Sequence, residues 1–164
     1  ARFVTPSFRG MAMNAIQIYP VLRESALQIL ETAAFLFLED LLPERIPAPA
    51  QWDAQDVRIS YSGHAEGSLE LWVEPKLAEI LAINMLGLDE SIAEVARERS
   101  VDALRECLNM ICGEFLLSYY GDEPIFNLSI PSSVEFLSLS PKEDCLVWLD
   151  AERYPLLVMH RSDG

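Results

Sequence analysis

The sequence predicts a single α+β domain, in which an antiparallel sheet of five to six strands packs against long helices. Its 164 residues suit one domain, and 51% of them are hydrophobic, so a sizeable core can form. Some stretches repeat apolar residues every three or four positions, as amphipathic helices do. Near the carboxyl end, short alternating stretches follow one another without an intervening helix, which favours antiparallel pairing.

The amino-terminal half is expected to contain one long helix and a hairpin. Residues 20–42 carry apolar residues at helical spacing, which predicts a helix lying across the sheet. Prolines in residues 43–53 end this helix and indicate a surface connection. Residues 56–63 and 67–75 alternate apolar and polar side chains on either side of a short loop, which predicts an antiparallel hairpin.

Two further helices are expected after the hairpin. Pro75 takes the favoured first-turn position of a helix that Gly87 closes. Residues 88–100 are charged and predicted to be helical in part, and they lead into a helix over 101–120 that Gly121 ends.

Three or four short strands are expected to complete the domain. These strands follow one another at spacings of roughly 8 to 12 residues with no helix between them, so they are expected to pair antiparallel. The candidate strands are 126–131, 133–140, 145–152 and 154–161. The domain is therefore expected to span residues 20–162, and residues 1–19 to form a poorly defined extension.

The charge balance argues against several classes of partner. The net charge is −14, with 26 acidic and only 12 basic residues, so no basic patch for nucleic acid or for an anionic membrane surface is expected. No stretch is long and apolar enough to cross a bilayer, and no signal peptide is visible, so a cytoplasmic location is expected. A protein is the favoured partner.

The cysteines and histidines give no pattern typical of a metal or nucleophile site. The three cysteines form no C-x-x-C pair and are interpreted as small buried hydrophobic residues in a reducing compartment. His64 and His160 have neither a nucleophile nor a second histidine at a recognised spacing. No metal site is therefore predicted in this chain.

The helix over 101–120 contains two residues that local propensity does not explain. Asn109 and Gly113 are both poor helix formers, glycine by about 1 kcal/mol relative to alanine. At 100° per residue they fall on one strip with Asp102 and Glu106, opposite an apolar stripe that faces the sheet. The members of the apolar stripe are Leu104, Leu108, Ile111 and Phe115.

This strip also has a purely structural interpretation, because Asp, Glu and Asn are ordinary residues on the solvated side of an amphipathic helix. Two features favour a function. Ala, Lys or Gln would serve an exposed helix better, and a broken local rule often marks a functional site. Glycine also lowers the helix surface, so that another protein can approach the backbone closely.

The stretch DALRECLNMICG resembles the D-x-x-x-E-x-x-N-x-x-x-G motif of the CheC, CheX and FliY phosphatases. The motif positions are Asp102, Glu106, Asn109 and Gly113. The family pattern continues to a proline about 22 positions after the asparagine, where Pro131 stands. Residues 59–87 also resemble the hairpin and helix that precede the motif in CheX-type members. The resemblance covers roughly residues 20–160 and implies a small CheX/CheC-like α+β domain, with a possible homodimer joined through sheet edges.

The resemblance implies hydrolysis of the phosphoaspartate of a phosphorylated CheY-like response regulator, in chemotaxis or another two-component circuit. Asn109 would orient the attacking water, and Glu106 would contact the regulator's active-site lysine. Asp102 would stabilise the helix or contact the partner, while Gly113 and Pro131 would shape the contact surface. The chain would need no cofactor of its own, because Mg²⁺ is expected in the partner's active site.

A second motif would be expected in CheC-type members, which carry an internal pseudo-repeat. Here Glu31 is followed three positions later by Ala34, where an asparagine would be required. Asn84 looks similar, but Leu81 precedes it by three, so no acid accompanies that amide. The chain therefore resembles CheX, with one active face.

Two other functions remain open at this point. The domain could be a non-catalytic module that binds a response regulator, or a relative of flagellar-switch proteins. The Glu106–Asn109 pair argues against this, because a docking surface needs no amide to orient water. An unrelated domain with a small-ligand pocket is the other alternative, and no sequence feature supports it.

Overall fold

The computed structural model describes residues 13–89, 93–140 and 143–162. Within them, six strands form one antiparallel sheet in the order β1-β5-β6-β3-β2-β4. The strands are β1 Leu38–Asp40, β2 Gln55–Gly63, β3 Gly67–Val73, β4 Phe126–Leu128, β5 Cys145–Ala151 and β6 Tyr154–Ser162. The predicted α+β class is thus confirmed.

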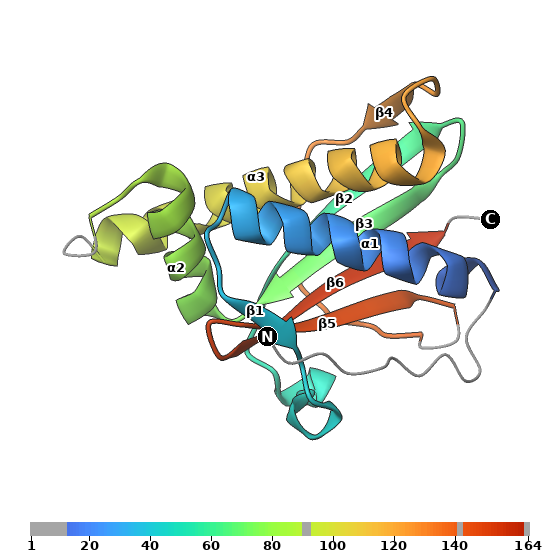
Figure 1. The fold of residues 1–164 in the computed structure, drawn as a ribbon. Coiled ribbons are helices and arrows are strands. Elements are labelled where there is room, and N and C mark those ends of the chain that lie inside the picture. Colours follow the sequence, from blue (N-terminus) through green and yellow to red (C-terminus); the bar gives the residue numbers. More distant parts are fainter. Residues whose placement is uncertain (1–12, 90–92, 141–142, 163–164) are drawn as a thin grey trace.

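Three α-helices accompany the sheet in the described residues. They are α1 Met13–Thr32, α2 Pro75–Leu86 and α3 Ala93–Tyr120. α1 and α3 lie side by side across one face of the sheet, and α2 packs against the amino-terminal part of α3 (Figure 1). Two 3-10 turns, Pro43–Arg45 and Pro49–Gln51, lie in the proline-rich connection. No helix in the described residues has both the length and the apolarity needed to cross a membrane.

The predicted hairpin is present as β2 and β3, with Ile59 opposite Leu69. Gly63 ends β2 with a φ of 127°, and a Cβ at this position would lie 2.7 Å from the carbonyl oxygen of Ile125. Only glycine fits there, because φ is positive and the backbone of the segment before β4 is too close for a side chain. The hairpin and the edge strand β4 are therefore held tightly together at this end.

The main core lies between the helices and the sheet. β2 contributes Val57, Ile59 and Tyr61 to it, and α3 contributes residues along its whole buried side. Burying these side chains stabilises the fold by roughly 1.5–3 kcal/mol for each large apolar residue. α3 is consequently fixed against the sheet, and its opposite side faces outward.

A second, smaller core covers the other face of the sheet. Trp72, Leu157 and Met159 are buried there beneath Trp52 and the segment 134–139. This cover explains why every residue of β3 is buried, although the strand faces helices on one side only. Glu70, only 3% exposed, is among them.

The first helix begins and ends earlier than the periodicity predicts. The predicted helix over 20–42 is wrong in both limits, because α1 spans Met13–Thr32 with Pro20 inside it. Proline usually occupies the first turn of a helix, which is why the prediction placed the start at Pro20. Here Pro20 lies within α1, on its exposed side. Of the expected extension over 1–19, residues 1–12 lie outside the described residues, and the rest form the start of α1.

The end of the predicted first helix is instead a turn followed by strand β1. Phe35 has a positive φ of 54°, which breaks any helix at this point. Leu36 and Leu38 are 5% exposed, whereas Phe37 between them is 61% exposed. This period of two marks a strand, but the uninterrupted apolar run hides it among helical spacings.

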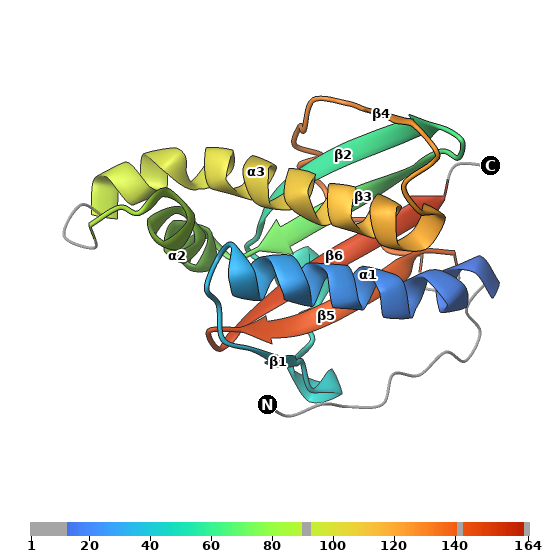
Figure 2. The same cartoon turned by 45° about the horizontal axis from the view of Figure 1, so that its top comes forward.

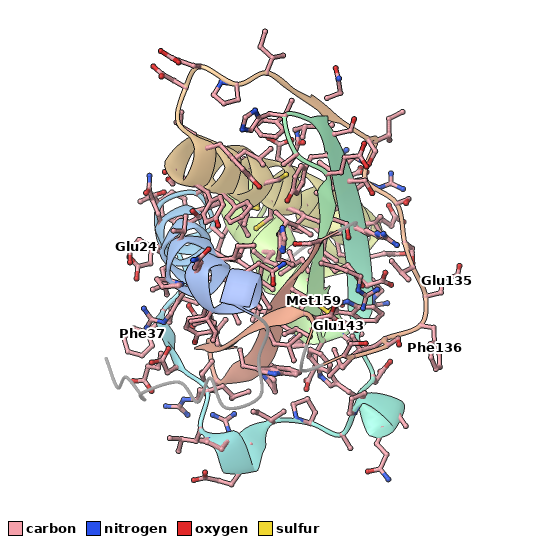
Figure 3. The ribbon with its side chains drawn as sticks, turned by 90° about the vertical axis from the view of Figure 1, so that its right-hand side faces the viewer. Glu24, Phe37, Glu135, Phe136, Glu143 and Met159 are labelled. Carbon is pink, nitrogen blue, oxygen red and sulfur yellow. The ribbon has the colours of Figure 1, made fainter. Side chains whose placement is uncertain are left out.

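The predicted strand over 133–140 is also wrong. Ser132 makes an isolated bridge to Arg58 of β2, after which the chain leaves the sheet ladder. Glu135 has a φ of 68°, and Val134 before it and Leu137 after it pack onto the second core. Figure 3 shows Glu135 and Phe136 pointing away from the sheet on the outer side of this segment. The alternating pattern thus reflects a segment that packs over the face of the sheet, not a strand within it.

The remaining elements follow the sequence closely. α2 starts at Pro75 and ends just before Gly87, as predicted. Residues 93–100 of the charged segment are continuous with the predicted helix over 101–120, and together they form α3. The predicted strands over 145–152 and 154–161 are present as β5 and β6, which pair antiparallel.

Candidate functional site on helix α3

The buried side of α3 is the predicted apolar stripe. Leu104, Leu108, Ile111 and Phe115 are each at most 1% exposed. Cys107 and Cys112 are buried beside them, in agreement with their interpretation as small hydrophobic residues. Because this side is held so firmly, the residues on the outer side have a fixed spacing and direction.

The outer side of α3 carries the motif strip, which we define as Asp102, Glu106, Asn109 and Gly113. All four residues are exposed. Spacings of four, three and four residues place each one next to the previous one on the helix surface. In Figure 2, no other described element crosses the central turns of α3. The strip is therefore accessible to another molecule.

The two residues with predicted chemical roles make no polar contact within the described chain. Neither the Glu106 carboxylate nor the Asn109 amide has a hydrogen-bond or ion-pair partner there. The Asp102 carboxylate, in contrast, lies 3.7 Å from Nη1 of Arg99, and both side chains are more than half exposed. Glu106 and Asn109 can thus form new hydrogen bonds without first breaking internal ones.

The structure offers no internal reason for glycine at position 113. A Cβ at Gly113 would have no heavy atom within 4 Å, apart from its own helix neighbours. Its φ is not positive, so alanine could adopt the same backbone. The cost of about 1 kcal/mol in helix propensity is therefore not recovered in the isolated chain. A close approach by a partner would explain it.

Pro131 lies on the edge segment that follows β4. Around it, Ser129 donates its N–H to the carbonyl of Ser60, and Ser132 exchanges two hydrogen bonds with Arg58. Proline has no N–H, so it is suited to an edge position between such bonds. No hydrogen bond or ion pair in the described residues joins Pro131 to the strip.

The incomplete second motif has a structural role instead. Glu31 is exposed near the end of α1, and Ala34 is fully buried. Nδ2 of Asn84 donates a hydrogen bond to the carbonyl oxygen of Ala34, at 2.8 Å. Neither position therefore presents an amide to solvent as Asn109 does.

Both histidines contact tyrosine side chains within the fold. His160 is buried, and its Nε2 lies 2.7 Å from the hydroxyl of Tyr61. His64 is exposed, with its ring against Tyr120. The described part of the chain has no group of three His, Cys, Asp or Glu side chains arranged to hold a metal ion.

The family model for the chemotaxis phosphatase CheX matches residues 57–143, slightly more than half of the chain. The chain belongs to the CheX family. The matched region contains all but the first two residues of the β2–β3 hairpin, together with α2, α3 and Pro131, and so includes the complete motif strip. No curated protein matches the sequence.

Solved structures of CheX and related proteins share the fold. CheX in the CheX–CheY–BeF3–Mg²⁺ complex of Borrelia burgdorferi is 16% identical, with a TM-score of 0.66, and the match covers 93% of this chain and 100% of that one. A CheC-like protein of Shewanella oneidensis is 19% identical, with a TM-score of 0.68, covering 92% and 100%. FliY of Thermotoga maritima is 17% identical, with a TM-score of 0.56, covering 94% and 92%. At these identities the likeness concerns the fold.

Proposed function

We propose that this CheX-family chain hydrolyses the phosphoaspartate of a CheY-like response regulator through the motif strip. The observation that carries the proposal is the pair Glu106 and Asn109, exposed on one side of a rigid helix and without internal partners. A CheX relative forms a complex with CheY, BeF3 and Mg²⁺, which supports a CheY-like partner for this chain.

Asn109 is proposed to orient the attacking water. An acyl phosphate is already activated, so catalysis requires mainly that a water be held in line with the leaving carboxylate. The Asn109 amide can accept a hydrogen bond from that water without placing a negative charge beside the phosphoryl group. A glutamine that positions water in GTPases works on the same physical basis.

The reaction transfers the phosphoryl group to water. The water oxygen forms a new bond to phosphorus while the bond between phosphorus and the aspartate oxygen breaks. The electron pair of the broken bond stays on the regulator's carboxylate, and the proton of the water passes to the released inorganic phosphate or to solvent. Asn109 positions the water and does not change its own protonation state.

Glu106 is proposed to bind the regulator's active-site lysine. It lies one turn from Asn109, so the two side chains can enter the same pocket of the partner. A charge-assisted hydrogen bond of this kind contributes about 1.5–3 kcal/mol when it is partly desolvated. The contact would place Asn109 over the phosphoryl group.

The remaining residues of the site are proposed to support docking. Asp102 would hold Arg99 at the edge of the contact surface, Gly113 would leave room for the partner's backbone, and Pro131 would shape the adjacent sheet edge. Mg²⁺ would be held by the regulator's own carboxylates, which are the ligands it prefers. The chain would then contribute no metal ligand.

A non-catalytic role as a regulator-binding or flagellar-switch-like module is the second candidate. The fold by itself does not separate this candidate from a phosphatase. It predicts binding without accelerated loss of phosphate, so the same assay separates the two.

The test is the decay of phosphate from a panel of CheY-like regulators phosphorylated with acetyl phosphate and Mg²⁺. Asn109→Ala is compared with wild type, and Asn127→Ala on β4 provides a matched control that also removes an exposed amide. We expect wild type and Asn127→Ala to accelerate decay of at least one regulator, and Asn109→Ala to bind it without accelerating decay. Binding by wild type without acceleration would support the second candidate instead.

A further inference from the structure

The described arginines of α3 differ in their ion-pair partners. Nε of Arg97 lies 3.3 Å from a carboxylate oxygen of Glu79, and Nη1 of Arg99 lies 3.7 Å from Asp102. Arg105 is exposed and has no carboxylate within 4 Å in the described residues. Its guanidinium is therefore available to a group outside the chain.

Arg105 lies directly beside the motif strip. It precedes Asn109 by four residues, and Glu106 precedes Asn109 by three. On the helix surface, Asn109 thus lies between them, about 40° from Arg105 on one side and about 60° from Glu106 on the other. Neighbours at these spacings have Cβ atoms about 5–6 Å apart. A positive and a negative side chain therefore flank the amide.

Arg105 lies in line with residues of α3 that the fold buries. Cys112 and Leu116 lie on the same side of α3, further along the helix, and are 0% and 5% exposed. Arg105 stands where this side becomes open. Its exposed side chain is a helix-surface neighbour of Asn109, on the side from which a partner would approach.

We propose that Arg105 binds a carboxylate at the rim of the regulator's phosphorylation pocket and so sets the orientation in which the regulator docks. This inference rests on the proposed function. The pocket that holds Mg²⁺ must be lined by carboxylates, and a guanidinium recognises a carboxylate through two parallel hydrogen bonds. Arg105 is thus a positioning residue, because it does not contact the reacting atoms.

The charge pattern around Asn109 lets this contact select one docking orientation. The chain carries a net charge of −14, so most of its surface repels an acidic partner. With Arg105 on one side of Asn109 and Glu106 on the other, one docking orientation pairs both charges with opposite charges on the regulator. The reversed orientation places like charges together, which disfavours it.

The experiment measures initial rates of dephosphorylation against regulator concentration, using a phosphorylated regulator that wild type dephosphorylates. Arg105→Ala, Arg105→Lys and Arg105→Glu are compared with Arg97→Ala, which removes the same charge from an exposed site on the same helix. Binding to the regulator loaded with beryllofluoride and Mg²⁺ is measured in parallel.

At low salt we expect Arg105→Ala to raise the half-saturating regulator concentration about fivefold, with a maximal rate within about twofold of wild type. Arg105→Lys keeps the charge but not the two parallel hydrogen bonds, so its affinity should lie between those of wild type and Arg105→Ala, and Arg105→Glu should weaken binding by about tenfold or more. The effect of Arg105→Ala should shrink at high salt, because screening weakens an exposed charge pair. Arg97→Ala should behave as wild type.

Equal behaviour of Arg105→Ala and Arg97→Ala would overturn the inference, as would a loss of maximal rate without loss of affinity. The proposed function fails separately. If wild type accelerates no regulator, both proposals are wrong. If wild type is active, Asn109→Ala is inactive and Arg105→Ala matches wild type, only the role of Arg105 is wrong.

Discussion

The side chain of Asn84 donates a hydrogen bond from Nδ2 to the backbone carbonyl of Ala34, at 2.8 Å. This bond ties α2 to the turn that follows α1. Ala34 stands where a second motif would need its asparagine, and Asn84 is the amide whose local sequence resembles the motif. The structure therefore gives the two asparagines of α2 and α3 different functions, since one holds the fold and the other faces solvent.

Substitution of these two asparagines should separate stability from activity. Asn84→Ala is expected to lower the free energy of unfolding by about 1–2 kcal/mol, because the partly buried carbonyl of Ala34 loses its donor. Asn109→Ala should change it by less than about 0.5 kcal/mol, because Asn109 is exposed and makes no internal hydrogen bond. Urea unfolding measures both, and phosphatase assays should show the reverse order of effects. An Asn109→Ala protein that is clearly destabilised would indicate a structural role.

Gly113→Ala should make the isolated protein more stable. The site has an ordinary helical backbone and open space, so alanine should raise the free energy of unfolding by about 0.5–1 kcal/mol. If a partner approaches the helix here, the added methyl group should weaken regulator binding. Thermal unfolding and a binding titration test the two halves. Higher stability with unchanged binding would show that glycine is not needed for docking.

Glu70 should make stability depend on pH. Burial raises the pKa of Glu70 above its ordinary value of 4.5, while a hydrogen bond from Trp72 and the charges of Arg161 and Arg58 oppose the rise. A carboxyl group with a raised pKa in the fold favours the protonated form. Ionisation of Glu70 therefore lowers the free energy of unfolding. This destabilisation is absent below pH 4.5 and develops as pH rises through the folded-state pKa.

Glu70→Gln removes this charge and keeps an oxygen that can accept from Nε1 of Trp72, whose present distance to Glu70 is 3.0 Å. We expect the variant to be more stable than wild type at pH 8, and this difference to shrink as pH falls. Urea unfolding at several pH values measures it. A difference that grows on acidification would contradict the sign of the shift.

The cysteines should be unreactive in the native protein. Burial raises the pKa of each of the three thiols, Cys107, Cys112 and Cys145, to about 12. Almost no thiolate then exists at pH 8, and labelling by a thiol reagent should be at least about a hundredfold slower than in the unfolded chain. Mass spectrometry of timed samples follows each site. Rapid labelling of one thiol would reveal local opening around it.

The sequence predicts the fold well where the hydrophobic periodicity agrees with the positions of glycine and proline. The β2–β3 hairpin and α2 match because alternation or helical spacing ends at glycine or proline in each case. β1 is missed because its three residues lie within an apolar run that also fits a helix. The segment 133–140 is misassigned because alternation can arise from packing on a sheet as well as from pairing within it.

The candidate site is predictable in part. Helical spacing places the motif strip opposite the apolar stripe, and the structure has these sides buried and exposed accordingly. Spacing cannot distinguish Arg105 from any other charge on a solvated helix. Its difference from Arg97 and Arg99 depends on where Glu79 and Asp102 lie in space, which only the folded chain determines.

The division of α3 into a buried side and an outer side has a consequence for a cell that carries a damaged copy of this protein. The residues that fold the helix and those proposed to act on the regulator do not overlap, so their substitution effects should be nearly independent. Loss of Asn109 alone would leave a folded protein that still occupies the regulator. Such a protein would shield the phosphoryl group from intact copies, and one altered side chain would turn a terminator of the signal into its protector.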